Sequence, residues 1–210
     1  MIINGLPLIC ILSFSILTHN ISVAAKNGKA IQNADAQAIM QTLGDETLGV
    51  VNSNLTQDVV VRSFINIIDR FFVAHNITKF VFGTSYRKMN EQQRNIATNC
   101  LKVMMAMQYS AKFADFKGAS FKIVNVKKSS DKHSFVNAKL TTKNAEYDLS
   151  CSIFLSDGSW KIFDVIVDGT SMSKIMRAGL EGRINKEGLD SFLASFEKKY
   201  GDFNGAAKKK

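Results

Sequence analysis

Residues 156–172, which read SDGSWKIFDVIVDGTSM, decide the fold of this chain. The pair Asp157-Gly158 is typical of a tight turn, and the residues after it have the hydrophobic pattern of a β-strand. Because side chains alternate between the faces of a strand, both faces of this one are predicted to be apolar. One face carries Trp160, Ile162 and Ile166, and the other carries Phe163, Val165 and Val167. A strand covered on both sides is expected near the centre of a sheet.

Three further strands precede this one. After Gly118 the hydrophobic period becomes two residues, which predicts strands over 119–127, 133–142 and 145–155, before the strand at 159–168. In the third of these, apolar residues from Tyr147 to Leu155 alternate with polar ones, so one face is expected to meet a core. The connections between the strands are short and polar. They predict an antiparallel meander.

The chain before Gly118 has the period of helices instead. Helices are predicted over 35–51 (one helix or a pair), from Thr56 to about residue 74, over 78–82, and from Asn90 toward Gly118. The last of these is the longest and begins at a capping box formed by Asn90 and Gln93. Two more helices, near 171–183 and 186–200, follow the strands.

This order of elements predicts an α+β fold. N-terminal helices are expected to pack on a curved, mostly antiparallel sheet of about four strands, followed by C-terminal helices, as in an NTF2-like cone that encloses an apolar pocket. The chain has fifteen Phe and eight Met residues. Several of the methionines lie in segments that should flank the sheet: Met104, Met105, Met107, Met172 and Met176. Flexible thioether side chains suit a pocket for flexible ligands, although by themselves they are explained better by ordinary core filling.

The N-terminus has the pattern of an export signal. Residues 1–25 contain no Asp, Glu, Lys or Arg, and residues 6–17 form an apolar run of signal-peptide length. Small residues near Ala24 and Ala25 predict cleavage there, with an uncleaved interfacial anchor as the alternative. Residues 26–205 are then expected to form a single domain, and residues 206–210 a disordered basic tail.

The net charge indicates which kinds of partner to expect, and the number of cysteines indicates whether disulfides hold the fold. The chain carries 27 basic and 18 acidic residues, a net charge of +9. In an exported protein this excess favours phospholipid headgroups or an acidic partner and not nucleic acid, while a simply solvated basic surface is the alternative. Cys100 and Cys151 are too few for a disulfide scaffold and are expected to be two buried thiols, with a disulfide between them in an oxidising compartment as the alternative.

Several short motifs, taken together in order and spacing, resemble the MlaC family over residues 35–200. Phe80-Val81-Phe82-Gly83 with Tyr86-Arg87 is similar to the family's F-V-L-G-x-x-W-R, and residues 90–94 (NEQQR) occupy the place of its T-P-E-Q-R. Residues 160–165 (WKIFDV), with Gly169 and Ser171, resemble W-K-V-Y-D-V followed by G-V-S. Arg177 stands where the family's N-Y-R ends, and Gly188-Leu189-Asp190 resembles its closing G-L-D.

The resemblance implies a periplasmic phospholipid carrier without a cofactor. Such a carrier shuttles lipid between an inner-membrane ABC transporter complex, with its substrate-binding MCE-type subunit, and an outer-membrane lipoprotein complex. No nucleic acid is involved, and the lipid is cargo. The headgroup is expected outside the pocket, near Lys174 or Arg177. The predicted lining of the lipid pocket is apolar: Phe80, Val81, Leu149, Cys151, Ile153, Phe163, Val165, Val167, Met172, Met176 and Leu180.

Two other classes of function compete with the carrier. An NTF2-like isomerase or dehydratase would use Asp164 as a base, supported by His75 or His133, although no readable spacing pairs them. A secreted binder of another apolar small molecule would share the same pocket. The sequence contains no phosphate-binding loop, metal-ligand cluster, dinucleotide fingerprint or nucleophile elbow.

Overall fold

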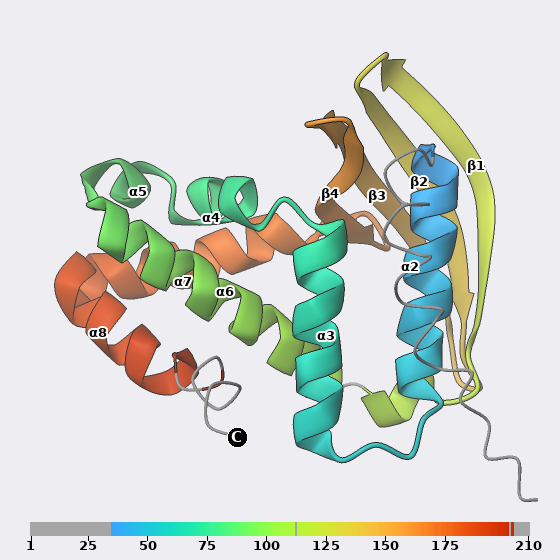
Figure 1. The fold of residues 1–210 in the computed structure, drawn as a ribbon, viewed down its shortest axis with the longest axis horizontal. Helices are drawn as coiled ribbons and strands as arrows, with labels where there is room; N and C mark the ends of the chain where they lie inside the picture. Colours follow the sequence, from blue (N-terminus) through green and yellow to red (C-terminus); the bar gives the residue numbers. More distant parts are fainter. Residues whose placement is uncertain (1–34, 112, 202, 204–210) are drawn as a thin grey trace, which may run out of the picture.

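The computed structural model describes residues 35–111, 113–201 and 203, and it confirms the α+β class (Figure 1). Five helices come first: α2 (Ala36–Val51), α3 (Gln57–Phe71), α4 (Ala74–Phe82), α5 (Thr84–Lys88) and α6 (Glu91–Ala111). A short 3₁₀ helix, η1 (Phe113–Phe116), leads to β1 (Ser120–Ser130), β2 (His133–Thr141), β3 (Glu146–Ser156), β4 (Ser159–Val167) and β5 (Thr170–Ser171). The helices α7 (Met172–Glu187) and α8 (Leu189–Tyr200) follow. The predicted signal peptide and basic tail lie outside the described residues.

The sheet is the predicted antiparallel meander, open and ordered β1-β2-β3-β4-β5. It has five strands where about four were expected, because residues 170–171 pair with the end of β4. The expectation that β4 is central is wrong. Its far edge pairs only with the two-residue β5 and, at Ile162, with Phe72 through an isolated parallel bridge. The Val73 N–H donates to the Ile162 carbonyl at 3.0 Å, so the end of α3 closes this edge.

A β-bulge in β4 changes which residues share a face. Cys151 lies opposite Val165, but Ile153 lies opposite Ile162, with a register shift between Ser152 and Ile153. Because Cys151 and Ile153 are two residues apart on β3, their partners Val165 and Ile162 lie on one face. The prediction that these two point in opposite directions is therefore wrong. Phe163 is the extra residue, which a strict period of two cannot reveal.

Local signals account for most helix ends. The predicted capping box is confirmed, since the Gln93 N–H donates to Asn90 Oδ1 at 2.9 Å and the Asn90 N–H donates to Gln93 Oε1 at 3.0 Å. Gly83, with a φ of 53°, ends α4 and lets the unpredicted α5 begin. Residues 36–51 form one helix and not a pair. Its Gly44 has a steric reason: a Cβ there would lie 2.5 Å from the Phe121 ring of β1.

The start of α7 is held by β4. Asp164 accepts the Ser171 hydroxyl at 2.6 Å and the Ser173 N–H at 3.0 Å. Ser171 is itself the N-cap and accepts the Lys174 N–H at 3.2 Å. These bonds satisfy orphan donors of the first turn, so they orient α7 relative to the sheet.

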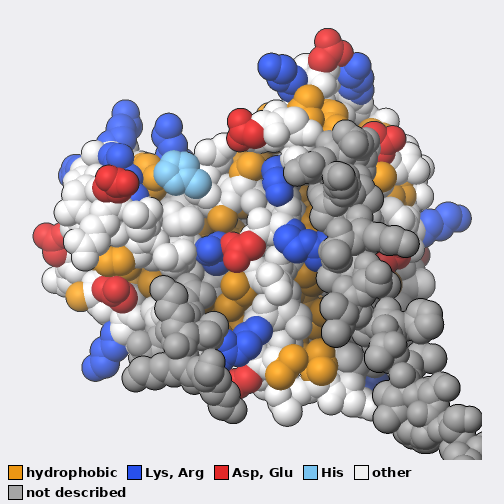
Figure 2. Space-filling view, viewed as in Figure 1, with side chains coloured by type: hydrophobic (Ala, Val, Ile, Leu, Met, Phe, Trp, Pro, Cys, Tyr) orange, Lys and Arg blue, Asp and Glu red, His pale blue; other side chains and the backbone are white. Residues whose placement is uncertain are grey.

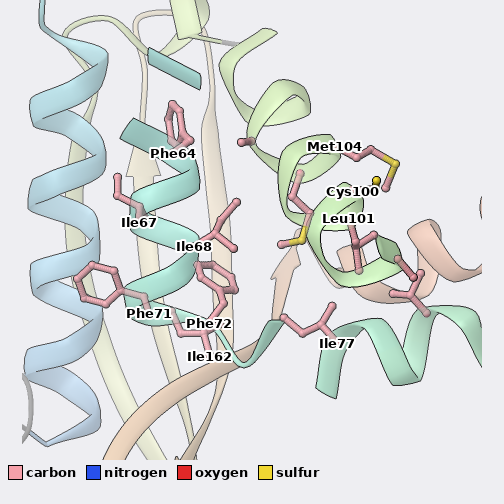
Figure 3. Packing of buried hydrophobic residues seen from close by; sticks show 14 of the residues in the cluster. Phe64, Ile67, Ile68, Phe71, Phe72, Ile77, Cys100, Leu101, Met104 and Ile162 are labelled. Carbon is pink, nitrogen blue, oxygen red and sulfur yellow. The ribbon is translucent and has the colours of Figure 1, made fainter. Parts of the chain in front are cut away.

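Two regions share one buried core. We call α2, α3, η1 and the sheet the sheet region, and α4–α8 the helical region (Figure 1). Figure 3 shows their boundary, where α3, which carries Phe64 and Ile68, faces α6, which carries Leu101. Within the helical region, Phe82 lies edge-on to Phe192 and Phe196, with ring centroids 6.0 and 6.2 Å away. Among the described residues, no helix is long and apolar enough to cross a membrane.

Candidate functional site

The sheet region contains a cavity of about 320 Å³ between α2, α3, the end of α6 and the inner face of the sheet. Helix α2 forms one wall, and the sheet forms the opposite one. Native interiors rarely leave voids larger than a water molecule, so a cavity of this size is a candidate ligand site. Its lining comprises Met40, Leu43, Gly44, Thr47, Leu48, Val51, Phe64, Ile67, Ile68, Phe72, Gln108, Tyr109, Phe116, Phe121, Leu140, Leu149, Cys151, Val165, Val167 and Met172.

The lining is almost entirely apolar. It holds none of Asp, Glu, Lys, Arg or His among the described residues, and its polar side chains are Thr47, Gln108 and Tyr109. Gln108 is the exposed member of the set, whereas the others are buried or partly buried. An uncharged, apolar space of this kind can hold hydrocarbon and cannot solvate an ion.

Five of the predicted pocket residues line this cavity: Leu149, Cys151, Val165, Val167 and Met172. Leu149 and Cys151 lie opposite Val167 and Val165 on neighbouring strands, so the four form a continuous apolar patch on the inner face of the sheet. Two more, Phe163 and Met176, border a second void of about 10 Å³ together with Asp164 and Ser173. That void is about large enough for one water molecule.

The remaining predicted residues lie away from the cavity. Phe80 stacks edge-on against Phe163, with centroids 5.6 Å apart, because the bulge turns Phe163 away from the lining. Ile153 is fully buried in β3 opposite Ile162. Val81 and Leu180 are buried on α4 and α7, in the helical region. The hydrophobic character of these four residues indicated that they pack in the interior. It did not indicate whether they face the cavity or the rest of the core.

The cations predicted near the headgroup do not line the cavity. The Arg177 guanidinium lies 5.3 Å above the Phe80 ring and 3.8 Å from Glu181. It also lies against Gly83, where a Cβ would come within 3.0 Å of it. Arg177 therefore joins α7 to the end of α4. Lys174 is exposed on the first turn of α7.

Helix α2 supplies six lining residues that sequence reasoning did not assign to the pocket. Their only signal was the helical spacing of Met40, Leu43 and Val51, which is the spacing of any buried helix face. Gly44 adds a second signal in retrospect. It lets α2 approach β1 until the Phe121 ring fills the place of its side chain.

Burial raises the pKa values of two ionisable groups in the cavity lining and of one outside it. It raises the pKa of the Cys151 thiol to about 12, with the nearby Asp164 carboxylate as a smaller cause. Burial is also the largest cause of the raised pKa of the Tyr109 phenol. The negative charges of Cys151 and Asp164 raise this pKa further. Cys100 has a pKa raised to about 11, first by burial and then by Glu197. Both cysteines are buried free thiols, as expected.

The three residues considered for catalysis have separate partners. Asp164 accepts its two bonds from the start of α7, while His133 bonds to Ser152 at 3.1 Å. His75 lies 3.2 Å from the Tyr86 hydroxyl. None of the three lines the large cavity, and the described residues contain no cluster of His, Cys, Asp or Glu that could hold a metal ion.

Comparison with known proteins identifies the fold and the family. The model of the family described as MlaC protein matches residues 41–198. The chain belongs to the MlaC family. It is 18% identical over 195 residues to the intermembrane phospholipid transport system binding protein MlaC of Haemophilus influenzae, covering 88% of this chain and 91% of that protein. Its fold is similar to that of a phospholipid-binding protein from Ralstonia solanacearum, determined in complex with a phospholipid. The TM-score is 0.69 at 15% identity, over 81% of this chain and 99% of that one.

Most residues that carry the resemblance to MlaC proteins hold the fold rather than line the cavity. Asp164 positions α7, Asn90 caps α6, and Gly188, with a φ of 79°, separates α7 from α8. Tyr86 is buried, with the Arg94 guanidinium 5.0 Å above its ring. The motif residue that reaches the cavity is Val165.

Proposed function

We propose that this chain is a periplasmic phospholipid carrier of an intermembrane transport system. The observation that carries the proposal is the uncharged cavity of about 320 Å³ between α2, α3 and the sheet. Its volume lies within the range of small-molecule sites in proteins, roughly 300–1,000 Å³. Membership of the MlaC family and the fold shared with a phospholipid-binding protein support the same ligand class.

The energetics of hydrocarbon explain why such a carrier needs an enclosed site. Two acyl chains contain about thirty methylene groups, and at about 0.8 kcal/mol each their exposure to water would cost on the order of 25 kcal/mol. A protein that carries lipid through water must therefore cover the chains. In this proposal the acyl chains occupy the cavity, with Leu149, Cys151, Val165, Val167 and Met172 as the sheet side of the site.

We place the partners of the carrier in two membranes. Lipid is exchanged with an inner-membrane ABC transporter complex, through its MCE-type subunit, and with an outer-membrane lipoprotein complex. The net charge of +9 would speed encounter with acidic surfaces. On the face shown in Figure 2, basic side chains are dispersed among acidic ones, so long-range attraction is expected to matter more than one basic patch.

Native mass spectrometry tests the proposal. The protein should be purified from a bacterial envelope without detergent, and its bound species extracted and identified. A carrier is expected to retain phospholipid. A ligand-free protein that also fails to take up phospholipid from vesicles would refute the proposal, and a different co-purified apolar molecule would favour the alternative binder.

A further inference from the structure

Tyr109 presents an unpaired hydroxyl group at the wall of the cavity. The side chain lies near the end of α6 and borders both the large cavity and the 10 Å³ void. Within the part of the chain that the structure describes, its hydroxyl makes no hydrogen bond, whereas the hydroxyl of the buried Tyr86 lies 3.2 Å from a His75 ring nitrogen. No described side-chain nitrogen or oxygen is both buried and unpaired, so this hydroxyl opens onto the space of the cavity, where a ligand can reach it.

The neighbours of Tyr109 in the described structure do not pair with its hydroxyl. Phe64 lies beside its ring, with centroids 6.3 Å apart. Asp164, whose charge contributes to the raised pKa of Tyr109, accepts the Ser171 hydroxyl and the Ser173 N–H instead. Burial raises the pKa of Tyr109, so the hydroxyl stays protonated at neutral pH and is available as a donor. An acceptor atom of a ligand in the cavity can therefore bind to this hydroxyl.

The charge of the lining indicates which acceptor fits. A phosphate oxygen would bring a negative charge to a wall without Lys or Arg among its described residues, and burying an uncompensated charge is costly. A neutral carbonyl oxygen brings no charge. In a phospholipid such oxygens belong to the acyl esters, at the point where the apolar chains begin.

We propose that the Tyr109 hydroxyl donates a hydrogen bond to an acyl-ester carbonyl of the bound lipid, and so sets the depth to which the chains enter the cavity. This inference rests on the proposed function, because it assigns a contact within the same site. Thr47 and Gln108 also lie in the lining without a side-chain hydrogen bond to a described residue, but Gln108 is exposed to solvent. Tyr109 and Thr47 are both partly buried, and of the two only Tyr109 also borders the 10 Å³ void beside the sheet.

The test is a cycle of two proteins and two lipids. Tyr109→Phe removes only the hydroxyl, and a diether phospholipid with the same headgroup and chain lengths removes only the ester carbonyls. We expect Tyr109→Phe to weaken binding of the diester lipid roughly fivefold, the size of one neutral hydrogen bond. The wild-type protein should prefer diester to diether lipid by a similar factor, and the variant should bind the two lipids equally.

Tyr86→Phe is the matched control, because it removes a buried hydroxyl outside the cavity. It should leave the preference for the diester lipid unchanged. Equal weakening of both lipids by Tyr109→Phe, or no weakening of either, would overturn the inference while leaving the carrier intact. A wild-type protein that binds neither lipid would overturn the proposed function itself. Circular dichroism and thermal unfolding establish that each variant is folded.

Discussion

The helical region and the sheet region use similar side chains but pack them to different densities. In the helical region, Phe192 and Phe196 stack with centroids 5.1 Å apart, and both are essentially inaccessible to solvent. In the sheet region, Phe64, Phe72 and Phe121 surround about 320 Å³ of space. The difference shows that hydrophobic content alone does not produce a solid core. What matters is whether the backbones can approach closely enough for the side chains to meet.

The geometry of the elements explains the difference. In the helical region, α4 and α8 lie close enough for the rings of Phe82, Phe192 and Phe196 to meet. The sheet instead curves away from α2 and α3, as Figure 1 shows. Helix α2 crosses this face from β1 to β4, and at Gly44 it meets the Phe121 ring of β1 closely. The middle of the curved face is left without a filling residue.

Truncating a large side chain should give the largest difference in the free energy of unfolding between the two regions. Phe192→Ala removes a ring from the solid core, so we expect a loss of about 3–5 kcal/mol in the free energy of unfolding. Leu149 already borders empty space. Leu149→Ala should therefore cost less than about 2 kcal/mol, below the usual range for a buried leucine. Urea unfolding of the lipid-free proteins measures both, and equal losses would contradict the contrast.

A buried carboxylate should abolish lipid binding without a comparable effect elsewhere. Val165→Glu places an unpaired acid on the cavity wall, and we expect lipid occupancy to fall at least tenfold, because such a group costs several kcal/mol to bury. Val124→Glu makes the same chemical change at a bulge of β1 where the side chain is 54% exposed, and should leave occupancy unchanged. Lipid is quantified by native mass spectrometry after circular dichroism confirms folding. Full occupancy in folded Val165→Glu would remove this residue from the site.

Enlarged side chains provide the reverse comparison. Val167→Phe can extend into the cavity, so the lipid-free protein should keep its free energy of unfolding within about 1 kcal/mol while its lipid uptake falls. Val81→Phe enlarges a side chain in the solid core and should cost about 1–3 kcal/mol, since overpacking forces strained side chains. Chemical denaturation and a vesicle uptake assay test the pair. A large loss of stability in Val167→Phe would show that the space is not available to side chains.

The two thiols should respond to alkaline pH in the same direction, although they lie in different regions. Their raised pKa values, about 12 for Cys151 and about 11 for Cys100, mean that folding favours the protonated form. This contribution to stability is complete below the ordinary pKa of about 9 and is lost as pH rises toward 11 and 12. At pH 9.5 we expect a loss of about 1 kcal/mol from Cys151. Urea unfolding at pH 8 and 9.5 should show a smaller pH effect in Cys151→Ala than in the wild-type protein.

Bound lipid should influence the Cys151 thiol alone, because this residue lines the cavity and Cys100 does not. Alkylation at pH 9.5 by a small apolar reagent is expected to slow at Cys151 when lipid is present and to stay unchanged at Cys100. Peptide mapping distinguishes the two sites. Equal protection of both thiols would indicate a general effect of lipid on stability.

Sequence alone was enough to predict the main helices and strands and their order, although not the short α5 and β5. Turn residues such as Asp157-Gly158, the capping box at Asn90 and the change of hydrophobic period after Gly118 act over a few residues, so they are legible without a structure. The meander, the longest helix and the family resemblance followed from them. Five of the eleven predicted lining residues also line the cavity, and four of them lie on β3 and β4, where alternation indicates one shared inner face.

Only the tertiary structure decided where the space lies and what faces it. The bulge at Phe163 exchanged the faces of β4 in mid-strand, and α2 became a wall through a contact between Gly44 and Phe121, 77 residues apart by their numbering. Tyr109 shows the same limit, since a tyrosine near a helix end gives no sign that its hydroxyl will face a cavity. These features depend on how closely distant backbones approach and at what angle, and the order of residues along one element does not contain that distance.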